Sequence, residues 1–561
     1  MWKKFFSTLR SYTTGERIVS IALAFVFLYS GTYLVFFAPS VTDSDTYYEG
    51  VVGYVSDLNP LFVDLNDVDR DISRLLFSGL TKYDPEKKMV VEDMATVKID
   101  QTQKIYTFTL KEGLKWHDSE PVTADDVVFT FANVIQSPDF LNPVLKANFE
   151  NVDIEKIDSK TVKFTLQKPL SFFLTNCTVG LLPAHIFKGL PVSEIQSSSL
   201  NQKPVGTGPY KIHDSYKIGL DEQGSLRLSR FEDYYGGTPA LPYIVFQTYP
   251  SVQSLLDHAD LLNGIVRLTG EEVDQFSLDR QKYSFTPYQL PQYTAVFFNM
   301  DRSNLKEKNV RLALEKAISK EDLLKLIPYR VAVDTPFLEL KQEEWIYKPS
   351  MVQAQGALFG SGWKFPEKDD STKISSLDLS TPVFRKNKKG ETLQFELLAP
   401  QFPANLRKDL ETEKTANFLR DAWQKIGIKI QVTRLPMQDF ADRVQKRDYD
   451  LLLAGQSLGY NFDTYSFWHS TQSTDVGLNF SNYKSFPADA LIEDVRVTFD
   501  SDRKTKSLQK LAKIIGDDIP AFFLFRDVYF YVSDKSVSEL QLQNMAFPAD
   551  RFANVVAWKK K

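Results

Sequence analysis

The stretch from Tyr106 to Val127 constrains the fold most strongly, because it combines a strand, a turn and a capped helix in one short run. Apolar and polar side chains alternate with the period of two expected of a half-buried strand in Tyr106-Thr-Phe-Thr-Leu-Lys111. Gly113 then allows the chain to turn, and Thr123 and Asp126 have the spacing of a capping box at a helix start. We therefore expect these residues to serve the structure.

Strand-like and helix-like runs alternate along the rest of the chain. Residues 161–166 and 393–398 have the pattern of strands, whereas residues 310–319 and 413–426 have the pattern of helices. This alternation predicts an α/β fold of the mixed α+β kind. A chain of 561 residues also exceeds what one hydrophobic core usually supports, so we expect two or three domains.

The composition is that of a globular protein. Hydrophobic residues make up 43% of the chain and charged residues 25%, with a net charge of −5. These values exclude a disordered chain and lack the basic excess of a nucleic-acid binder, so we expect no nucleic-acid partner. Cys177 is the single cysteine, which excludes an intrachain disulfide, and we expect it to be a small buried hydrophobic residue.

The N-terminal region predicts a membrane anchor. Residues 18–38 form an uncharged run of 21 residues, which as a helix spans ~31 Å, enough for a bilayer core. Basic residues precede the run and acidic residues follow it. The positive-inside rule then places residues 1–17 in the cytoplasm, with a linker at 39–46 and the body outside. We therefore expect a single-pass protein of the cytoplasmic membrane with an extracytoplasmic body.

A cleaved signal peptide is the alternative interpretation of this region, with a small-residue site at Ala38-Pro-Ser40. We rank it second, because the apolar run is longer than the ~7–15 residues of a typical signal-peptide core. No cysteine follows the run, so the chain lacks the acceptor of a lipoprotein anchor.

Several motifs along the chain occur in an order that resembles a known family. The segment from Phe108 to Val127 resembles the signature of the family 5 extracytoplasmic solute-binding proteins, the oligopeptide- and dipeptide-binding components of ABC importers. One departure is Ser119, where the family usually has glycine. Further matching blocks are Ser56-Asp-Leu-Asn-Pro60, Leu182-Pro-Ala-His-Ile-Phe187, Pro204-Val-Gly-Thr-Gly-Pro-Tyr210, Asp233-Tyr-Tyr-Gly-Gly237, Gly427-Ile-Lys-Ile-Gln-Val432 and Asp448-Tyr-Asp-Leu-Leu-Leu-Ala-Gly455.

The resemblance implies a two-lobed, periplasmic-binding-protein-like trap with an additional inserted domain. An oligopeptide or peptide-like solute would lie extended in a cleft that closes by hinge motion, and would be delivered to ABC permease subunits. The resemblance implies neither a cofactor nor catalysis, and we expect a monomer. The implied ranges are 47–77, 205–290 and 515–561 for lobe I, 78–204 for the inserted domain and 291–514 for lobe II.

The resemblance also implies where a ligand would bind. Gly53 and Tyr54 stand in the first cleft strand, and the specificity loop follows the strand that ends at Gly455. Peptide-binding relatives typically have a tryptophan, and three residues later an amine-binding aspartate, where this chain has Gln456 and Gly459. Tyr460 and Asp463 belong to the same loop. Asp463 either replaces the missing carboxylate or caps the helix that begins near Thr464, and the two interpretations stand level.

Other classes of function have weaker support. Gly455-Gln-Ser-Leu-Gly459 fits the nucleophile-elbow pattern of serine hydrolases, with Ser457 as nucleophile, but only His469 follows it. The five histidines are scattered without ligand spacing, so we expect no metal site. A membrane-anchored ligand sensor with the same fold is a further alternative that the sequence does not separate from import.

Overall fold

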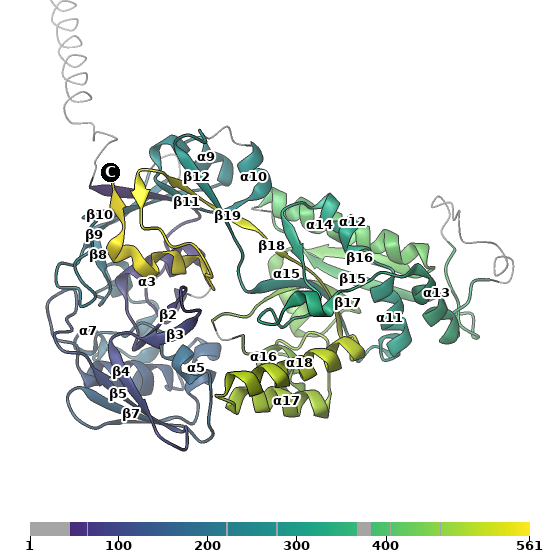
Figure 1. Cartoon of the computed structure of the whole chain (residues 1–561), viewed down its shortest axis with the longest axis horizontal. Coiled ribbons are helices and arrows are strands. Elements are labelled where there is room, and N and C mark those ends of the chain that lie inside the picture. The colour runs from purple at the N-terminus through teal and green to yellow at the C-terminus, as the bar shows by residue number, and fades with distance from the viewer. Residues whose placement is uncertain are drawn as a thin grey trace, which may run out of the picture. The chain divides into compact units, whose positions relative to one another are not determined.

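The computed structural model describes residues 45–63, 66–219, 223–275, 279–366, 383–403, 405–460 and 462–561. Residues 47–560 form one compact unit (Figure 1). The predicted cytoplasmic segment 1–17, the predicted membrane helix 18–38 and residues 39–44 of the linker lie outside the described residues. Among the residues that are described, no helix is long and apolar enough to cross a membrane.

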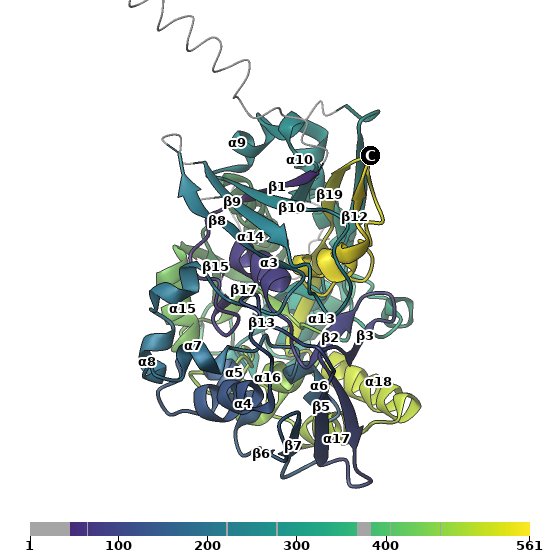
Figure 2. The ribbon, with the colours of Figure 1, turned by 90° about the vertical axis from the view of Figure 1, so that its left-hand side faces the viewer.

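A seven-stranded sheet organises the first part of the compact unit, with β1, β10, β9 and β8 side by side (Figure 2). Its strand order is β12-β19-β11-β1-β10-β9-β8. Side chains of α3 (Asp67–Leu76) and the 3₁₀ helix η8 (Pro548–Ala557) pack on one face, and α9 (Val252–Leu256) and α10 (Gly270–Gln275) cover the other. The strands are β1 (Thr46–Val52), β8 (Tyr210–Ile218), β9 (Gly224–Arg230), β10 (Tyr243–Tyr249), β11 (Gly264–Thr269), β12 (Tyr283–Tyr288) and β19 (Tyr529–Asp534).

A six-stranded sheet, in the order β14-β18-β13-β17-β15-β16, organises the second part. Because successive side chains of a strand point to opposite faces, Val296 and Phe298 of β13 belong to one core and Ala295 and Phe297 to another. The strands are β13 (Gln292–Phe298), β14 (Arg330–Ala332), β15 (Gln394–Pro400), β16 (Lys429–Leu435), β17 (Leu451–Ser457) and β18 (Ala521–Asp527).

Helices cover both faces of this second sheet, and Figure 1 shows α17 and α18 lying together beside α16. The first core takes its helical side chains from α11 (Lys308–Lys316), α12 (Lys320–Leu326), α13 (Met351–Gly360) and α14 (Leu406–Lys425). The second core takes them from α15 (Met437–Gln445), α16 (Tyr465–Trp468), α17 (Phe486–Val497) and α18 (Ser501–Asp518).

A four-stranded sheet in the order β4-β5-β7-β6 forms a third part with its own hydrophobic core. Its strands are β4 (Ala95–Ile99), β5 (Ile105–Leu110), β6 (Asp153–Lys156) and β7 (Thr161–Thr165), and a hairpin of β2 (Thr81–Asp84) and β3 (Met89–Glu92) precedes it. Its helices are α4 (Ala124–Val128), the π-helix η2 (Phe129–Ile135), α5 (Pro143–Phe149), α6 (Phe173–Asn176), α7 (Ala184–Phe187) and α8 (Val192–Ile195).

The remaining elements are short. Two residues each form β20 (Val537–Ser538) and β21 (Lys559–Lys560), which pair with one another. Single 3₁₀ turns are η3 (Ser199–Gln202), η4 (Ala259–Leu261), η5 (Ser303–Leu305), η6 (Gln342–Trp345) and η7 (Ser470–Gln472).

The strand and helix predicted from the opening motif are confirmed. Tyr106, Phe108 and Leu110 are the buried side chains of β5, and Thr123 and Asp126 form the capping box of α4. Ser119, where the family usually has glycine, has a φ of +77°, the left-handed region that favours glycine. Cys177 is fully buried in the third core, as predicted.

The Gly206 and Gly208 pair of the Pro204–Tyr210 motif passes against the end of α3. A Cβ at Gly206 would lie 1.8 Å from the Leu76 carbonyl oxygen, and one at Gly208 would lie 2.3 Å from the Leu75 carbonyl oxygen. The amide of Gly208 donates to the Leu76 carbonyl at 2.8 Å. Only residues without a side chain fit so close an approach of two backbones.

The chain passes from the first sheet to the second and back at two neighbouring places. It leaves the first sheet between β12 and β13 and returns to it between β18 and β19. A hydrogen bond of 3.0 Å from Gln292 Nε2 to the Tyr529 hydroxyl links the two connections. The boundary expected at residue 515 would assign β18 to the first lobe, whereas β18 pairs with β13 and β14 in the second sheet. The return therefore lies between Asp527 and Tyr529.

Candidate functional site

The predicted ligand loop begins at the end of β17, in the middle of the second sheet. β17 runs antiparallel to β13, with Gln456 opposite Tyr293. The Gln456 side chain is 4% exposed; its Oε1 accepts from the Tyr293 hydroxyl at 2.5 Å and its Nε2 donates to the Leu478 carbonyl at 3.0 Å. Both ends of this amide are occupied within the protein, so Gln456 holds the start of the loop in place.

The tip of the loop contacts residues of η8 and of the β2–β3 hairpin. The Tyr460 hydroxyl donates to Asp550 Oδ1 at 2.8 Å, and the Tyr460 ring stacks on Tyr83 with 4.8 Å between ring centroids. Gly459 has a φ of +67°, and a Cβ there would lie 3.8 Å from the ring of Phe547. Burial raises the pKa of Tyr460, and the nearby Asp550 carboxylate adds to this effect. The loop thus joins the second sheet to η8 and β2.

Asp550 anchors the loop tip because its carboxylate is almost fully engaged. Its Oδ2 accepts from the backbone amides of Ala546 at 2.9 Å and Phe547 at 2.8 Å, while Oδ1 accepts from Tyr460. Burial raises the pKa of Asp550, and Arg74 opposes this effect. No local pattern pointed to Asp550, which lies 90 positions from Tyr460 along the chain.

Two arginines of α3 add positive charge beside the loop tip, and neither was among the predicted site residues. Arg70 lies over the Phe547 ring, with its guanidinium carbon 5.0 Å from the ring centroid. Burial acts to lower the pKa of Arg74, but Tyr460 and Asp550 outweigh burial and raise that pKa. The spacing of four residues, which puts both side chains on one helix face, is the sequence signal that could have found them.

Gly53 and Tyr54 follow β1, which ends at Val52, and lie at the start of α3. Gly53 has a φ of +125°, and its amide donates to the Tyr249 carbonyl at 2.9 Å. The carbonyl of Tyr54 accepts from Asn66 Nδ2 at 3.0 Å, and Asn66 is the N-cap of α3. The Tyr54 side chain is 65% exposed, so it is available to a ligand and does not belong to the core.

Asp463 lies away from the loop tip, at the start of α16. Its Oδ1 accepts from the Tyr465 amide at 3.0 Å, and its Oδ2 lies 3.1 Å from Arg496 Nε. The guanidinium of Arg496 in turn lies over the Tyr465 ring at 4.3 Å. These contacts favour the helix-capping interpretation of Asp463 over the amine-binding interpretation.

The geometry around Ser457 does not support a hydrolase. Ser457 is the last residue of β17 and pairs with Gln292, whereas a nucleophile elbow stands on a tight turn between a strand and a helix. His469 Nδ1 bonds to the Thr471 hydroxyl at 2.8 Å, and its Nε2 lies 3.5 Å from Glu493. No metal-holding group of three or more His, Cys, Asp or Glu side chains occurs in the part of the chain that the structure describes.

Two open sheets joined by two neighbouring connections, with a loop of the second sheet against η8 beside the first, are the arrangement of bilobal solute-binding proteins. A family model described as bacterial extracellular solute-binding proteins, family 5, matches residues 89–477. The chain belongs to this family.

Curated relatives and solved structures agree with this assignment. The oligopeptide-binding protein AppA of Bacillus subtilis is 25% identical over 507 residues, covering 85% of each chain. The dipeptide-binding protein of Escherichia coli is 20% identical over 501 residues, covering 82% of this chain and 88% of its own.

The solved structures show the shared fold. Bacillus subtilis AppA in complex with a nonapeptide has a TM-score of 0.70 at 23% identity, covering 92% of this chain and 99% of its own. Campylobacter jejuni NikZ in complex with Ni(L-His) has a TM-score of 0.72 at 23% identity, covering 92% of this chain and 100% of its own. The predicted mixed α/β fold of the periplasmic-binding-protein kind is confirmed.

Proposed function

We propose that this protein is the solute-binding component of an ABC importer, which captures an oligopeptide or peptide-like solute and delivers it to a membrane permease. Family membership and relatives named for oligopeptides and dipeptides support the proposal. The observation that carries it is the contact of the β17 loop, through Tyr460, with Asp550 of η8 and Tyr83 of β2. A ligand held between the lobes would lie against elements of both.

Lobe closure would act through the two neighbouring connections between the sheets. We propose that lobe I comprises residues 47–77, 205–290 and 528–561, that lobe II comprises residues 291–527, and that residues 78–204 are inserted in lobe I. The Tyr288 and Tyr529 rings, 5.7 Å apart, keep the two connections together. Few backbone angles need to change when two lobes rotate about such a pair of strand ends.

The ligand contacts that we propose come from both lobes. Gly53 and Tyr54 would contribute from lobe I, and Gly459 and Tyr460 from lobe II. Gln456 and Asp463 would act through the loop, because their side chains fasten its two ends. The extended backbone of a peptide offers the amides and carbonyls that such a site pairs with, and this form of recognition tolerates varied side chains.

Peptide binding should be visible as stabilisation. A ligand present at a hundred times its dissociation constant adds about 2.7 kcal/mol to the free energy of unfolding, which raises the midpoint of thermal unfolding. We expect at least one pool from a screen of mixed dipeptides to hexapeptides to raise the midpoint of residues 45–561. Amino-acid mixtures of the same composition are the control. A complete screen without a shift would contradict the peptide assignment.

We further propose that residues 18–38 anchor the protein in the cytoplasmic membrane, with the body on the extracytoplasmic side. The uncharged run and the charge difference across it support this proposal. The full-length protein should fractionate with the cytoplasmic membrane, retain its N-terminus and be digested by protease added to spheroplasts. N-terminal sequencing that finds mature protein beginning at Val41 would show secretion instead.

A further inference from the structure

Phe172 and Phe173 are neighbours in the sequence, but their side chains lie in different hydrophobic cores. Phe173 is fully buried in the core of the inserted part, residues 78–204, with 4.7 Å between its ring centroid and that of Tyr106. Phe172 is 6% exposed and lies in the core that α17 and α18 form with the second sheet. Leu170 packs against both cores. The inserted part thus places one phenylalanine inside lobe II.

The polar groups of Ser171 complete the C-terminal end of α17. Its amide donates to the Arg496 carbonyl at 2.7 Å, and its hydroxyl donates to the Val495 carbonyl at 3.3 Å. Because α17 ends at Val497, both carbonyls are among the last four of the helix, which have no partner within it. Residues 170–172, which we call the hook, are therefore held on lobe II by hydrogen bonds as well as by apolar packing.

A charged side chain of α18 adds a third contact to the hook. Lys504 Nζ lies 3.9 Å from the centroid of the Phe172 ring, within the range of a cation–π interaction. Burial lowers the pKa of Lys504, and the carboxylates of Glu339 and Asp463 oppose this effect. The ammonium group that covers the Phe172 ring thus also interacts with a carboxylate of the ligand loop.

Arg496 connects the hook to the same end of the ligand loop. Its carbonyl accepts from the Ser171 amide, and its Nε lies 3.1 Å from Asp463 Oδ2. Its guanidinium also lies over the Tyr465 ring, 4.3 Å from the ring centroid. Asp463 in turn accepts from the Tyr465 amide at 3.0 Å. A single residue of α17 therefore contacts both the hook and the residue that fastens the second end of the loop.

The hook and the two connections between the sheets are separate contacts between the two sides of the molecule. The inserted part is continuous with lobe I, because α3 precedes it and β8 follows it. In Figure 1, α17 and α18 lie at the bottom, and β18 and β19, which carry one of the connections, lie above them. Lobes that open by rotation about the connections must therefore pull the hook away from α17.

We propose that the hook fastens the inserted part to lobe II when the lobes close, and that it positions the second end of the ligand loop through Arg496. Ser171 and Phe172 are then positioning residues, which act without touching the ligand. This role rests on the proposed function, in which the lobes close on a solute. The experiment below uses no ligand, so a hook that fails it and a peptide assignment that fails are separate results.

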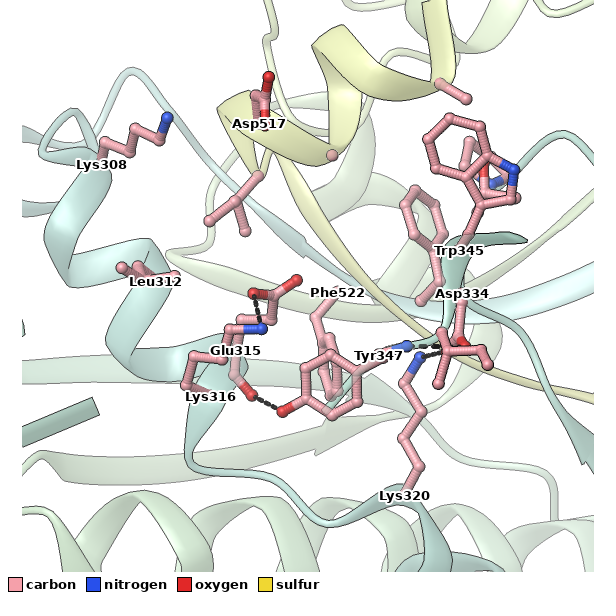
Figure 3. Close-up of a pocket in the computed structure, with 17 residues that line it drawn as sticks. Lys308, Leu312, Glu315, Lys316, Lys320, Asp334, Trp345, Tyr347, Asp517 and Phe522 are labelled. Atoms are coloured by element: carbon pink, nitrogen blue, oxygen red, sulfur yellow. Dashed lines mark hydrogen bonds and ion pairs between the residues drawn. The ribbon is translucent and has the colours of Figure 1, made fainter. Parts of the chain in front are cut away.

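A cavity elsewhere in lobe II supplies an internal reference for the experiment. The cavity has a volume of about 410 Å³ and lies beside the end of α18 that is remote from Lys504 (Figure 3). Lys320 pairs with Asp334 there, and the Tyr347 amide donates to Asp334 Oδ2 at 3.0 Å, as Figure 3 shows. None of the residues that line the cavity belongs to the inserted part. The Tyr347 amide should therefore stay protected when the hook is removed.

Hydrogen–deuterium exchange of the full-length protein tests the hook. In Phe172→Ala, exchange in residues 168–174 and 462–468 should rise by about ten- to hundred-fold, the effect of losing the burial of one phenylalanine ring. Exchange in residues 342–350, beside the cavity, should equal that of the wild type and so show that lobe II is folded. Phe173→Ala is the matched control, which should raise exchange in β5 and β7 and leave residues 462–468 unchanged.

Two further variants separate the hook from a general loss of packing. Phe172→Leu keeps most of the apolar volume, so its exchange should lie close to that of the wild type. Arg496→Met removes the guanidinium but keeps the carbonyl that accepts from the hook. It should raise exchange in residues 462–468 and not in 168–174, and adding Phe172→Ala should raise exchange in 462–468 little further.

Three results would overturn the proposal. Unchanged exchange in residues 462–468 of Phe172→Ala would show that the hook does not reach the ligand loop. An equal rise there in Phe172→Ala and Phe173→Ala would show that loosening of the inserted part, and not the hook, is the cause. Full additivity of Phe172→Ala and Arg496→Met would refute positioning through Arg496.

Discussion

Replacing Arg551 with methionine should lower the free energy of unfolding by about 3–5 kcal/mol, the cost of leaving a buried charge without its partner. Arg551 and Glu49 are both 0% exposed. Arg551 Nε lies 2.9 Å from Glu49 on β1, and Nη2 lies 2.8 Å from Asp71 on α3. Arg267 of β11 also pairs with Asp71, at 2.8 Å. The arginine thus joins η8 to β1 and α3.

The charge balance of this cluster explains the size of the effect. Burial opposes the charged form of Asp71, but Arg267 and Arg551 outweigh it and hold the pKa of Asp71 below its usual value. Without Arg551, Asp71 keeps Arg267, whereas Glu49 keeps only the hydroxyls of Tyr47 and Tyr531, each at 2.8 Å. The loss in the free energy of unfolding should therefore come mainly from Glu49.

Urea unfolding of residues 45–561 at pH 7 measures this effect. Arg503→Met is the matched control, because Arg503 is 67% exposed and pairs with Asp494 on the surface, where such a pair contributes about 1 kcal/mol or less. Adding Glu49→Gln to Arg551→Met should recover part of the loss by removing the uncompensated charge. Equal losses in Arg551→Met and Arg503→Met would contradict the proposed role of the cluster.

Stability should also fall by about 3 kcal/mol between pH 7 and pH 4 because of His117 alone. Gly206 donates its amide to His117 Nδ1 at 3.1 Å, and Nε2 lies 3.1 Å from the Gly208 carbonyl. The ring must be neutral, with its proton on Nε2, to make both bonds. Burial lowers the pKa of His117 from 6.5 to about 4.

The sign of the effect follows from which state binds the proton. Above pH 6.5 the ring is neutral in both states and the contribution is fully present; as the pH falls toward about 4, only the unfolded state takes up the proton. The difference between 6.5 and about 4, at about 1.4 kcal/mol per pH unit, gives about 3–4 kcal/mol in full. At pH 4 the folded state has itself bound about half a proton, so about 3 kcal/mol is lost by that pH. Carboxylates add their own dependence, so the comparison must be with a variant.

His117→Gln is that variant, because a glutamine amide can accept and donate without titrating. The difference in free energy of unfolding between wild type and His117→Gln should change by about 3 kcal/mol from pH 7 to pH 4. His213→Gln, at a histidine outside this pair of bonds, is the matched control for the substitution itself. If the difference in free energy of unfolding between wild type and His117→Gln stayed constant with pH, His117 would not be held neutral in the folded protein.

Local features of the structure could be predicted from the sequence because their causes lie within a few residues. The alternation of Tyr106, Phe108 and Leu110 and the capping pair of Thr123 and Asp126 are set by strand period and by helix-end hydrogen bonding. The order of the family motifs predicted the mixed α/β fold, which the relatives confirm. The amine-binding interpretation of Asp463 stood level with capping, because the sequence could not show Arg496 beside it.

Only the tertiary structure decided which distant segments meet. The residues of β18 have the pattern of a strand that either sheet could accept. Pairing with β13, more than 200 residues earlier, places them in the second sheet. Arg551 and Glu49 are 502 positions apart, and nothing in either segment specifies the other as its partner. The same holds for Tyr460 and Asp550, which lie 90 positions apart. Periodicity and capping act over single turns and strands, so the sequence alone determined the helices and strands. Burial and charge pairing depend on how all the elements pack together, so only the tertiary structure brought the residues of the candidate site together.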